Sequence, residues 1–233
     1  MPRPGSLPLH MQVSEGLIRD IAAGKLADGS RLPPERDMAE GLGIAIGTLR
    51  RALQTLQDQG LLHRVQGSGN YVRARADVAS IYALFRLELL TGGGLPTAQV
   101  LSVDRLVKDP GLPAFGPHAE GHRIRRLRFL SGQAAAVEEI WLDATRAATV
   151  TADDLSDSLY LFYRERLRLR IARAEDRIGI GRLPDWSPAA FPTAPGTLLP
   201  RVTRLAVAED GTPVEASWTW YDPAICAYVA RLG

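Results

Sequence analysis

Arg126 and Arg128 are the residues of this chain best suited to binding an anion. They are separated by one residue in a segment whose side chains alternate as in a β-strand, so both project from the same face. Two neighbouring guanidinium groups can converge on one phosphate or carboxylate. The hydroxyls of Ser158 and Tyr160 can complete such an anion shell.

Glu138 and Glu215 offer the opposite chemistry, because carboxylates can hold hydroxyls or an amine at the other end of a ligand. A second interpretation stays open for this segment. In it the arginines line a solvated edge strand and pair with the two glutamates at the surface; they are Arg123, Arg125, Arg126 and Arg128. The surface interpretation is favoured for Arg123 and Arg125.

Arg36, Arg50 and Arg51 form a second group in the first third of the chain. Arginine can bridge phosphates or read guanine bidentately. The amide of Gly67 can approach a sugar-phosphate edge, because no side chain intervenes. These residue types point to nucleic acid, although exposed arginines are often merely solvated.

The segment from Leu32 to Val72 supplies the elements that must hold this second group. Its apolar residues recur at intervals of three, four or seven, which predicts the buried faces of two amphipathic helices; they are Met38, Leu42, Leu49, Leu53 and Leu56. The boundary residues are Pro33 and Pro34 before a helix start at Glu35, Gly43 in the turn, and Gly60 at the second helix end. Two alternating stretches, Leu61–Val65 and Asn70–Arg73, flank Gly67-Ser68-Gly69 and predict a hairpin. The whole is the outline of a winged helix-turn-helix.

From about Leu7 to Val72 the chain resembles the DNA-binding domain of GntR-family transcriptional regulators. The matching stretches are LPLHMQ, AAGKLADGSRLPPERDMAEGLG, TLRRAL and GLLHRVQGSGNYV. The resemblance implies contacts to DNA from one helix and from the wing tip. The candidate residues are Arg36, Ile46, Thr48, Arg50, Arg51, Gln66 and Gly67.

The start of the expected recognition helix departs from the family pattern. The family usually has a small hydroxyl residue and an arginine where this chain has Ala45 and Ile46. Either Ile46 makes an apolar contact such as one to a thymine methyl, or specificity has moved to other positions, or DNA is bound weakly. We expect altered specificity.

After a short polar linker, RARADVAS, the chain is predicted to be mainly strands with one or two helices. Ile81–Leu90 is expected as a short helix or an extended segment, and Ser158–Arg166 as a helix. Strands are expected over TAQVLSVDRLV, Arg123–Phe129, Ala134–Leu142, Leu199–Val207 and Val214–Tyr221, with Leu169–Ile180 mixed. We expect an α+β fold of two domains, with DNA-binding residues 1–74, a linker and lead-in at 75–95 and a sheet domain at 96–233.

From about Val100 to Gly233 the chain resembles the UTRA effector-binding domain of the HutC-type GntR subgroup. The landmarks are HRIRRLRFLSGQAAAVEEIWLD, Ser158-Leu159-Tyr160 and DGTPVEASWTWY. The resemblance implies a mixed α/β, chorismate-lyase-like sheet domain. The pocket residues that it implies are Arg126, Arg128, Glu138, Ser158, Tyr160, Arg168, Glu215 and Tyr221. Trp218 and Trp220 are expected in a core or an interface.

The relatives usually carry a Leu- and Ala-rich helix before the penultimate strand, where this chain has LPDWSPAAFPTAPGTLLP. So many prolines cannot lie inside a helix. We expect an irregular loop along the pocket, which would reshape the choice of ligand.

The amino-acid composition excludes several other classes of protein. A chain of 233 residues with 45% hydrophobic content can build two cores. The basic excess lies up to Ala76, with ten Lys or Arg against seven Asp or Glu. A single cysteine, Cys226, excludes an internal disulfide and is expected as a packing residue, and four scattered histidines give no metal or cofactor site. No apolar run approaches the roughly twenty residues of a membrane span, so a cytoplasmic protein without a membrane partner is expected.

We therefore expect a homodimeric DNA-binding regulator and not an enzyme. The expected mechanism is a repressor released from a pseudo-palindromic operator by a small anionic metabolite, a sugar phosphate or an organic acid. Activation by the ligand stays open. Two alternatives remain. One is a non-specific nucleic-acid or protein-interaction module. The other is an enzyme that uses the pocket of the C-terminal domain, which the missing nucleophile–base pair disfavours.

Overall fold

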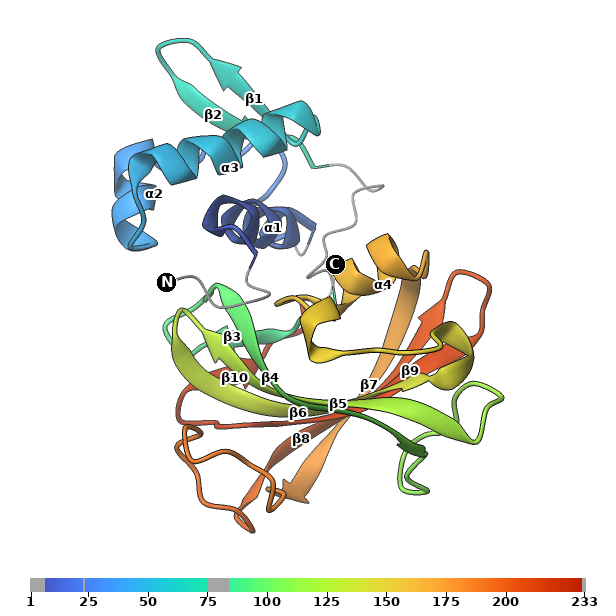
Figure 1. The fold of residues 1–233 in the computed structure, drawn as a ribbon. Coiled ribbons are helices and arrows are strands. Elements are labelled where there is room, and N and C mark those ends of the chain that lie inside the picture. Colours follow the sequence, from blue (N-terminus) through green and yellow to red (C-terminus); the bar gives the residue numbers. More distant parts are fainter. Residues whose placement is uncertain (1–6, 23, 75–83, 232–233) are drawn as a thin grey trace. The chain divides into compact units, whose positions relative to one another are not determined.

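The computed structural model describes residues 7–22, 24–74 and 84–231 and divides into two units, one built on Leu7–Phe85 and one on Arg86–Val229 (Figure 1). Most of the expected linker RARADVAS lies outside the described residues.

The first unit contains the predicted helices and hairpin. Its elements are α1 (Leu9–Ala22), α2 (Glu35–Gly41), α3 (Ile46–Asp58), β1 (Leu62–Val65) and β2 (Gly69–Val72). Leu49, Leu53 and Leu56 of α3 are buried, as the spacing predicts. Leu42 is not: α2 ends at Gly41, so Leu42 lies at its carboxyl end and is 36% exposed.

Glycines close the two turns of this unit. Gly43 has a φ of 64° between α2 and α3, and Gly60 has a φ of 72° just after α3. Side chains with a Cβ rarely adopt this left-handed backbone, and each glycine lies two residues after the last residue of its helix, where it turns the chain away. The hairpin gains a third partner, because Arg31 forms a bridge to Tyr71.

The second unit is built on one antiparallel sheet of six strands in the order β4-β5-β6-β9-β8-β7 (Figure 1). The strands are β4 (Pro96–Val107), β5 (Glu120–Leu130), β6 (Gln133–Asp143), β7 (Ile171–Arg182), β8 (Leu198–Ala208) and β9 (Pro213–Tyr221). Ser131 and Gly132 join β5 to β6, and both have a positive φ, as a two-residue hairpin turn requires. In this order β5 lies between β4 and β6, so it is an interior strand, and the edge-strand interpretation of Arg123–Arg128 is wrong.

The helix α4 (Leu159–Arg166) covers one face of the sheet (Figure 1). Phe162 and Tyr163 of α4 pack there against Ile124 of β5 and Ile140 of β6. Two short 3-10 helices, Ala144–Arg146 and Ala152–Asp154, precede it. Ser158 caps α4, since its hydroxyl accepts a hydrogen bond from the amide of Leu161 at 3.3 Å.

The proline-rich segment is irregular, as predicted, but it does not lie along the pocket. Leu183 and Phe191 pack against Leu127, Val137 and Trp220. Leu127 and Val137 alternate with Arg126 and Glu138 along their strands, so this cluster lies on the face opposite to α4. The expectation that this loop reshapes the pocket is therefore corrected.

Two further strands, β3 (Leu87–Leu89) and β10 (Cys226–Tyr228), pair as a separate two-stranded ribbon. This settles the described part of Ile81–Leu90 in favour of an extended segment. Leu169–Ile180, expected as mixed, is strand β7 from Ile171 onward. Cys226 is 1% exposed, which confirms its packing role.

Candidate functional site

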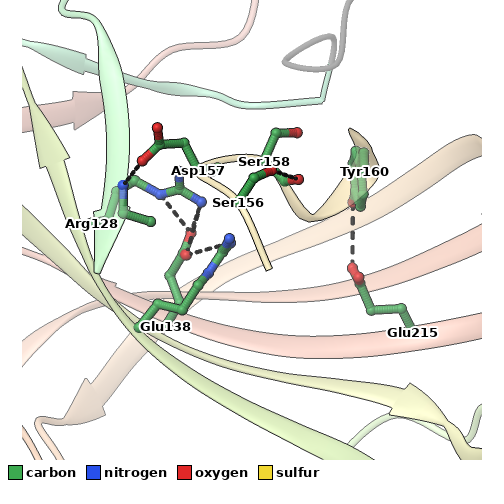
Figure 2. Close-up of polar contacts among 9 residues, drawn as sticks. Arg128, Glu138, Ser156, Asp157, Ser158, Tyr160 and Glu215 are labelled. Atoms are coloured by element: carbon green, nitrogen blue, oxygen red, sulfur yellow. Dashed lines mark hydrogen bonds and ion pairs between the residues drawn. The ribbon is translucent and has the colours of Figure 1, made fainter. Parts of the chain in front are cut away.

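Arg126, Arg128 and Glu138 form a buried charged group beneath α4. Their exposed fractions are 3%, 4% and 6%. Glu138 Oε2 lies 2.8 Å from Arg126 Nη2 and 3.0 Å from Arg128 Nη2. Figure 2 shows Arg128 between Glu138 and the segment before α4, where its Nη1 donates to the carbonyl of Asp157 at 3.0 Å. Strand alternation brings Arg126 and Arg128 to one face, as the sequence predicts. Glu138 lies between them and not at the other end of a ligand, so that expectation is corrected.

The group carries one positive charge more than its acid can balance. Burial favours the neutral acid, but the charges of Arg126 and Arg128 outweigh it and hold the pKa of Glu138 below its ordinary value. Burial also lowers the pKa of Arg126. Arg126 Nε and Nη1 are buried and have no hydrogen-bond partner among the residues that the structure describes. Such donors cost free energy unless a ligand or water satisfies them, so the arrangement is suited to an anion.

A second polar group lies at the other end of the same face. Tyr160 donates to Glu215 Oε1 at 3.4 Å, as Figure 2 shows. Glu215 is 3% exposed and Tyr163 is fully buried, and burial together with the Glu215 charge raises the pKa of the Tyr163 hydroxyl. Within the described residues, neither Glu215 Oε2 nor this hydroxyl makes a hydrogen bond. These atoms can accept from and donate to the hydroxyls of a ligand.

Burial raises the pKa of Glu215, which predicts a pH-dependent stability. Above the ordinary value of 4.5 and up to the raised pKa, the folded protein holds more protons than the unfolded chain. The free energy of unfolding therefore falls as pH rises through this range. We expect Glu215→Gln to gain stability relative to the wild type as pH increases, measured by denaturant unfolding at several pH values. A difference that is constant with pH would contradict this. Glu138 does not interfere, because its lowered pKa removes stability only as pH falls below 4.5.

The structure places the remaining predicted pocket residues unevenly. Tyr221 is buried on the α4 face, in register with Ala136, which in turn pairs with Arg128. Ser158 is buried at the start of α4. Arg168 lies in the turn after α4, exposed and with a φ of 53°, so the structure does not bring it into the buried group.

Three residues near this group were missed in the sequence. Tyr163 follows Tyr160 by three residues, a helical spacing that could have identified it. Asp176 and Arg204 come from β7 and β8, and only the register of those strands brings them together. No local pattern indicates that pairing.

The predicted DNA-contact residues are accessible on the first unit. Arg36, Arg50, Arg51, Gln66 and Gly67 are exposed and Thr48 is half-buried. Ile46, the first residue of α3, is 40% exposed and therefore accessible for an apolar contact. Arg50 Nε lies 2.8 Å from Glu35 Oε2, which joins α3 to the start of α2. Arg64 of β1 and Arg31 against Gly69 are further exposed cations at the wing.

Comparison with known proteins supports both halves of this architecture. The model "Bacterial regulatory proteins, gntR family" matches residues 9–72, and the UTRA domain model matches residues 92–224. The chain is 58% identical over 228 residues to the HTH-type transcriptional regulator SmoD of Agrobacterium fabrum, covering 98% of this chain and 97% of SmoD.

The chain belongs to the GntR family. This confirms the resemblance found in the sequence, including the UTRA domain. The chain is also 28% identical to the mannosyl-D-glycerate transport/metabolism system repressor MngR of Escherichia coli, over 75% of each chain. The crystal structure of YydK from Bacillus subtilis has the same fold, with a TM-score of 0.52 at 17% identity, and covers 97% of this chain and all of YydK.

GntR-family membership makes the protein a ligand-responsive DNA-binding transcription regulator and not an enzyme. The first unit binds DNA and the UTRA unit binds the small-molecule effector. Within the described residues, no three His, Cys, Asp or Glu side chains gather where they could hold a metal ion. The helices of the described part are too short or too polar to cross a membrane.

Proposed function

We propose that this regulator is a homodimeric repressor that a small anionic metabolite, a sugar phosphate or an organic acid, releases from a pseudo-palindromic operator. The observation that carries the ligand class is the buried pair Arg126 and Arg128 with only Glu138 between them. The excess charge and the two unpartnered donors of Arg126 favour a phosphate or carboxylate.

The other end of the ligand is a polar group with hydroxyls. Glu215 Oε2, on the same sheet face as Arg126, and the Tyr163 hydroxyl of α4 are buried without a hydrogen bond to any described residue. A fully apolar tail would leave them unsatisfied at a cost of about 1–3 kcal/mol each. An anion with several hydroxyls, such as a sugar phosphate, fits both ends.

Repression and dimerisation are supported by different observations. MngR is named as a repressor. A dimer places two winged helices on two half-sites, which a pseudo-palindrome requires. Ile178 and Ile180 on the edge strand β7 are 56% and 72% exposed, and neighbouring Leu198 is 59% exposed. An edge strand with apolar side chains and unpaired backbone groups suits a second copy of the chain.

The experiment that tests this proposal has two stages. The full-length protein selects sites from a random duplex pool at two salt concentrations, and the selected complex is then challenged with sugar phosphates and organic acids. Glucose serves as the neutral control for glucose 6-phosphate. We expect a palindromic motif, release by an anionic compound and no release by its neutral counterpart.

Arg126→Met separates the two halves of the proposal. This variant should bind the selected operator as the wild type does and lose its response to the anionic compound. A wild type that shows no motif, and whose binding falls uniformly with salt, would instead be a non-specific nucleic-acid module. Release by neutral compounds only would refute the anionic effector.

The Arg50–Glu35 ion pair leads to a prediction about the operator affinity. Glu35 competes with DNA for Arg50, and Arg50 in turn lowers the pKa of Glu35, so the acid stays charged. We expect Glu35→Gln to raise operator affinity about two- to fivefold, the range expected for an exposed ion pair. Glu40→Gln is the matched control, since it removes the same charge from the last turn of α2. Operator affinity should be measured by fluorescence anisotropy. If both variants gain the same affinity, the gain comes from the change in net charge and not from the release of Arg50.

A further inference from the structure

Asp176 lies at the centre of a chain of polar contacts that crosses the sheet unit. Arg204 Nε and Nη2 donate to its two carboxylate oxygens, each at 2.6 Å. The Tyr228 hydroxyl donates to Asp176 Oδ2 at 2.6 Å. The side chains of Arg204 and Asp176 are only 17% and 11% exposed. These hydrogen bonds thus join β10 to β7 and β8.

The same series of polar contacts reaches the effector group formed by Tyr160 and Glu215. Arg204 pairs with Ser217 of β9, so its side chain lies on the same face of the sheet as Glu215, two residues along that strand. From there the positive charge of Arg204 acts on both Tyr160 and Glu215. Arg204 therefore favours the arrangement in which Tyr160 donates to the Glu215 carboxylate.

At its other end, this series of polar contacts reaches the β3–β10 ribbon through Tyr228. Tyr228 pairs with Leu87, and the amide of Val229 donates to the carbonyl of Arg86 at 2.8 Å. β3 is the first element of the sheet unit and follows the linker in sequence. A ribbon of three residue pairs is short, so it can open at low cost in free energy.

We propose that Asp176, Arg204 and Tyr228 are positioning residues that couple the effector group at Tyr160 and Glu215 to the β3–β10 ribbon. A ligand that engages Glu215 redirects the Tyr160 hydroxyl and changes how Arg204 holds Asp176. The change reaches Tyr228 and shifts the ribbon between paired and open states. The inference rests on the proposed function for the ligand, but the coupling itself belongs to the protein without ligand.

Hydrogen exchange of the ligand-free, full-length protein tests this coupling directly. Tyr228→Phe and Tyr160→Phe should each speed exchange in peptides that cover Leu87–Leu89 and Cys226–Tyr228, by about two- to tenfold for one lost hydrogen bond. Tyr71→Phe is the matched control. It removes a tyrosine hydroxyl that lies 2.7 Å from the Ser68 hydroxyl in the DNA-binding unit, and should leave the ribbon unchanged.

A double-variant cycle distinguishes coupling from general loosening of the fold. In an Asp176→Asn background, Tyr160→Phe should add no further exchange at the ribbon, because the route is already broken. Arg204→Lys keeps the charge without the two-pronged contact and should resemble Asp176→Asn. Additive effects, or equal effects of Tyr160→Phe and Tyr71→Phe, would overturn the inference.

Operator release by glucose 6-phosphate provides a separate readout. If this compound releases the wild type, Tyr228→Phe should bind it with unchanged affinity and be released less. If it does not release the wild type, that result counts against the proposed effector, while the exchange cycle still decides the coupling.

Discussion

Glu138→Ala is expected to destabilise the sheet unit by about 3–5 kcal/mol, because it leaves two buried guanidinium groups without their shared counter-charge. Arg126 and Arg128 are 3% and 4% exposed, so water cannot replace the lost acid without opening the packing under α4. The free energy of unfolding should be measured by denaturant titration. All four tryptophans lie in the sheet unit, so their fluorescence reports on it alone.

Two further variants serve as controls for the stability of Glu138→Ala. Glu120→Ala breaks an ion pair of the same kind, with Arg105 at 2.8 Å, but both side chains are about 40% exposed and a loss of at most about 1 kcal/mol is expected. Glu138→Gln keeps the shape and an acceptor oxygen, and should fall between the two. If Glu138→Ala unfolds like Glu120→Ala, the charged group is not buried in solution and the anion site loses its basis.

Local patterns were sufficient to predict the elements and much of the anion site. Residues two apart on a strand share a face, which placed Arg126 with Arg128. Glu138 was expected at the other end of the ligand, and only the β5–β6 register brings it between the two arginines. The spacing of Leu49, Leu53 and Leu56 predicted the buried side of α3. In each case the deciding contacts lie within one element or between neighbouring hairpin strands.

The misses involve contacts between distant segments. Leu183 and Phe191 are apolar in a loop without periodicity, so nothing in that loop indicated which face of the sheet it covers. Asp176 and Arg204 meet through the β7–β8 register, across the fifteen-residue loop 183–197. Leu42 fails for a smaller reason, since a helix of seven residues ends before the repeat that predicted its burial. Long-range packing decided the first two, and the local end of a short helix decided the third.

Arg50→Ala is expected to weaken binding to the selected operator about tenfold to a hundredfold, as for loss of one bidentate contact to a base or of a phosphate contact. Arg50 lies on the exposed side of α3, and its side chain is 63% exposed. Its Nε lies 2.8 Å from the Glu35 carboxylate, a contact that an operator phosphate or base must replace. The Kd should be measured by fluorescence anisotropy at several salt concentrations.

Arg177→Ala is the matched control for this variant. Arg177 is also exposed, at 80%, and its Nε also lies 2.8 Å from a glutamate, Glu175, but it lies on β7 of the other unit. The same loss of charge and of an ion pair should therefore leave operator affinity within about twofold of the wild type. The salt dependence then assigns the contact. A phosphate contact lowers the slope of log K against log salt by about one for every operator sequence, whereas a base contact keeps the slope and relaxes selection at one position of the half-site. Because Ile46 replaces the usual arginine at the start of α3, a base contact by Arg50 would show that reading of the operator has moved one turn along the helix.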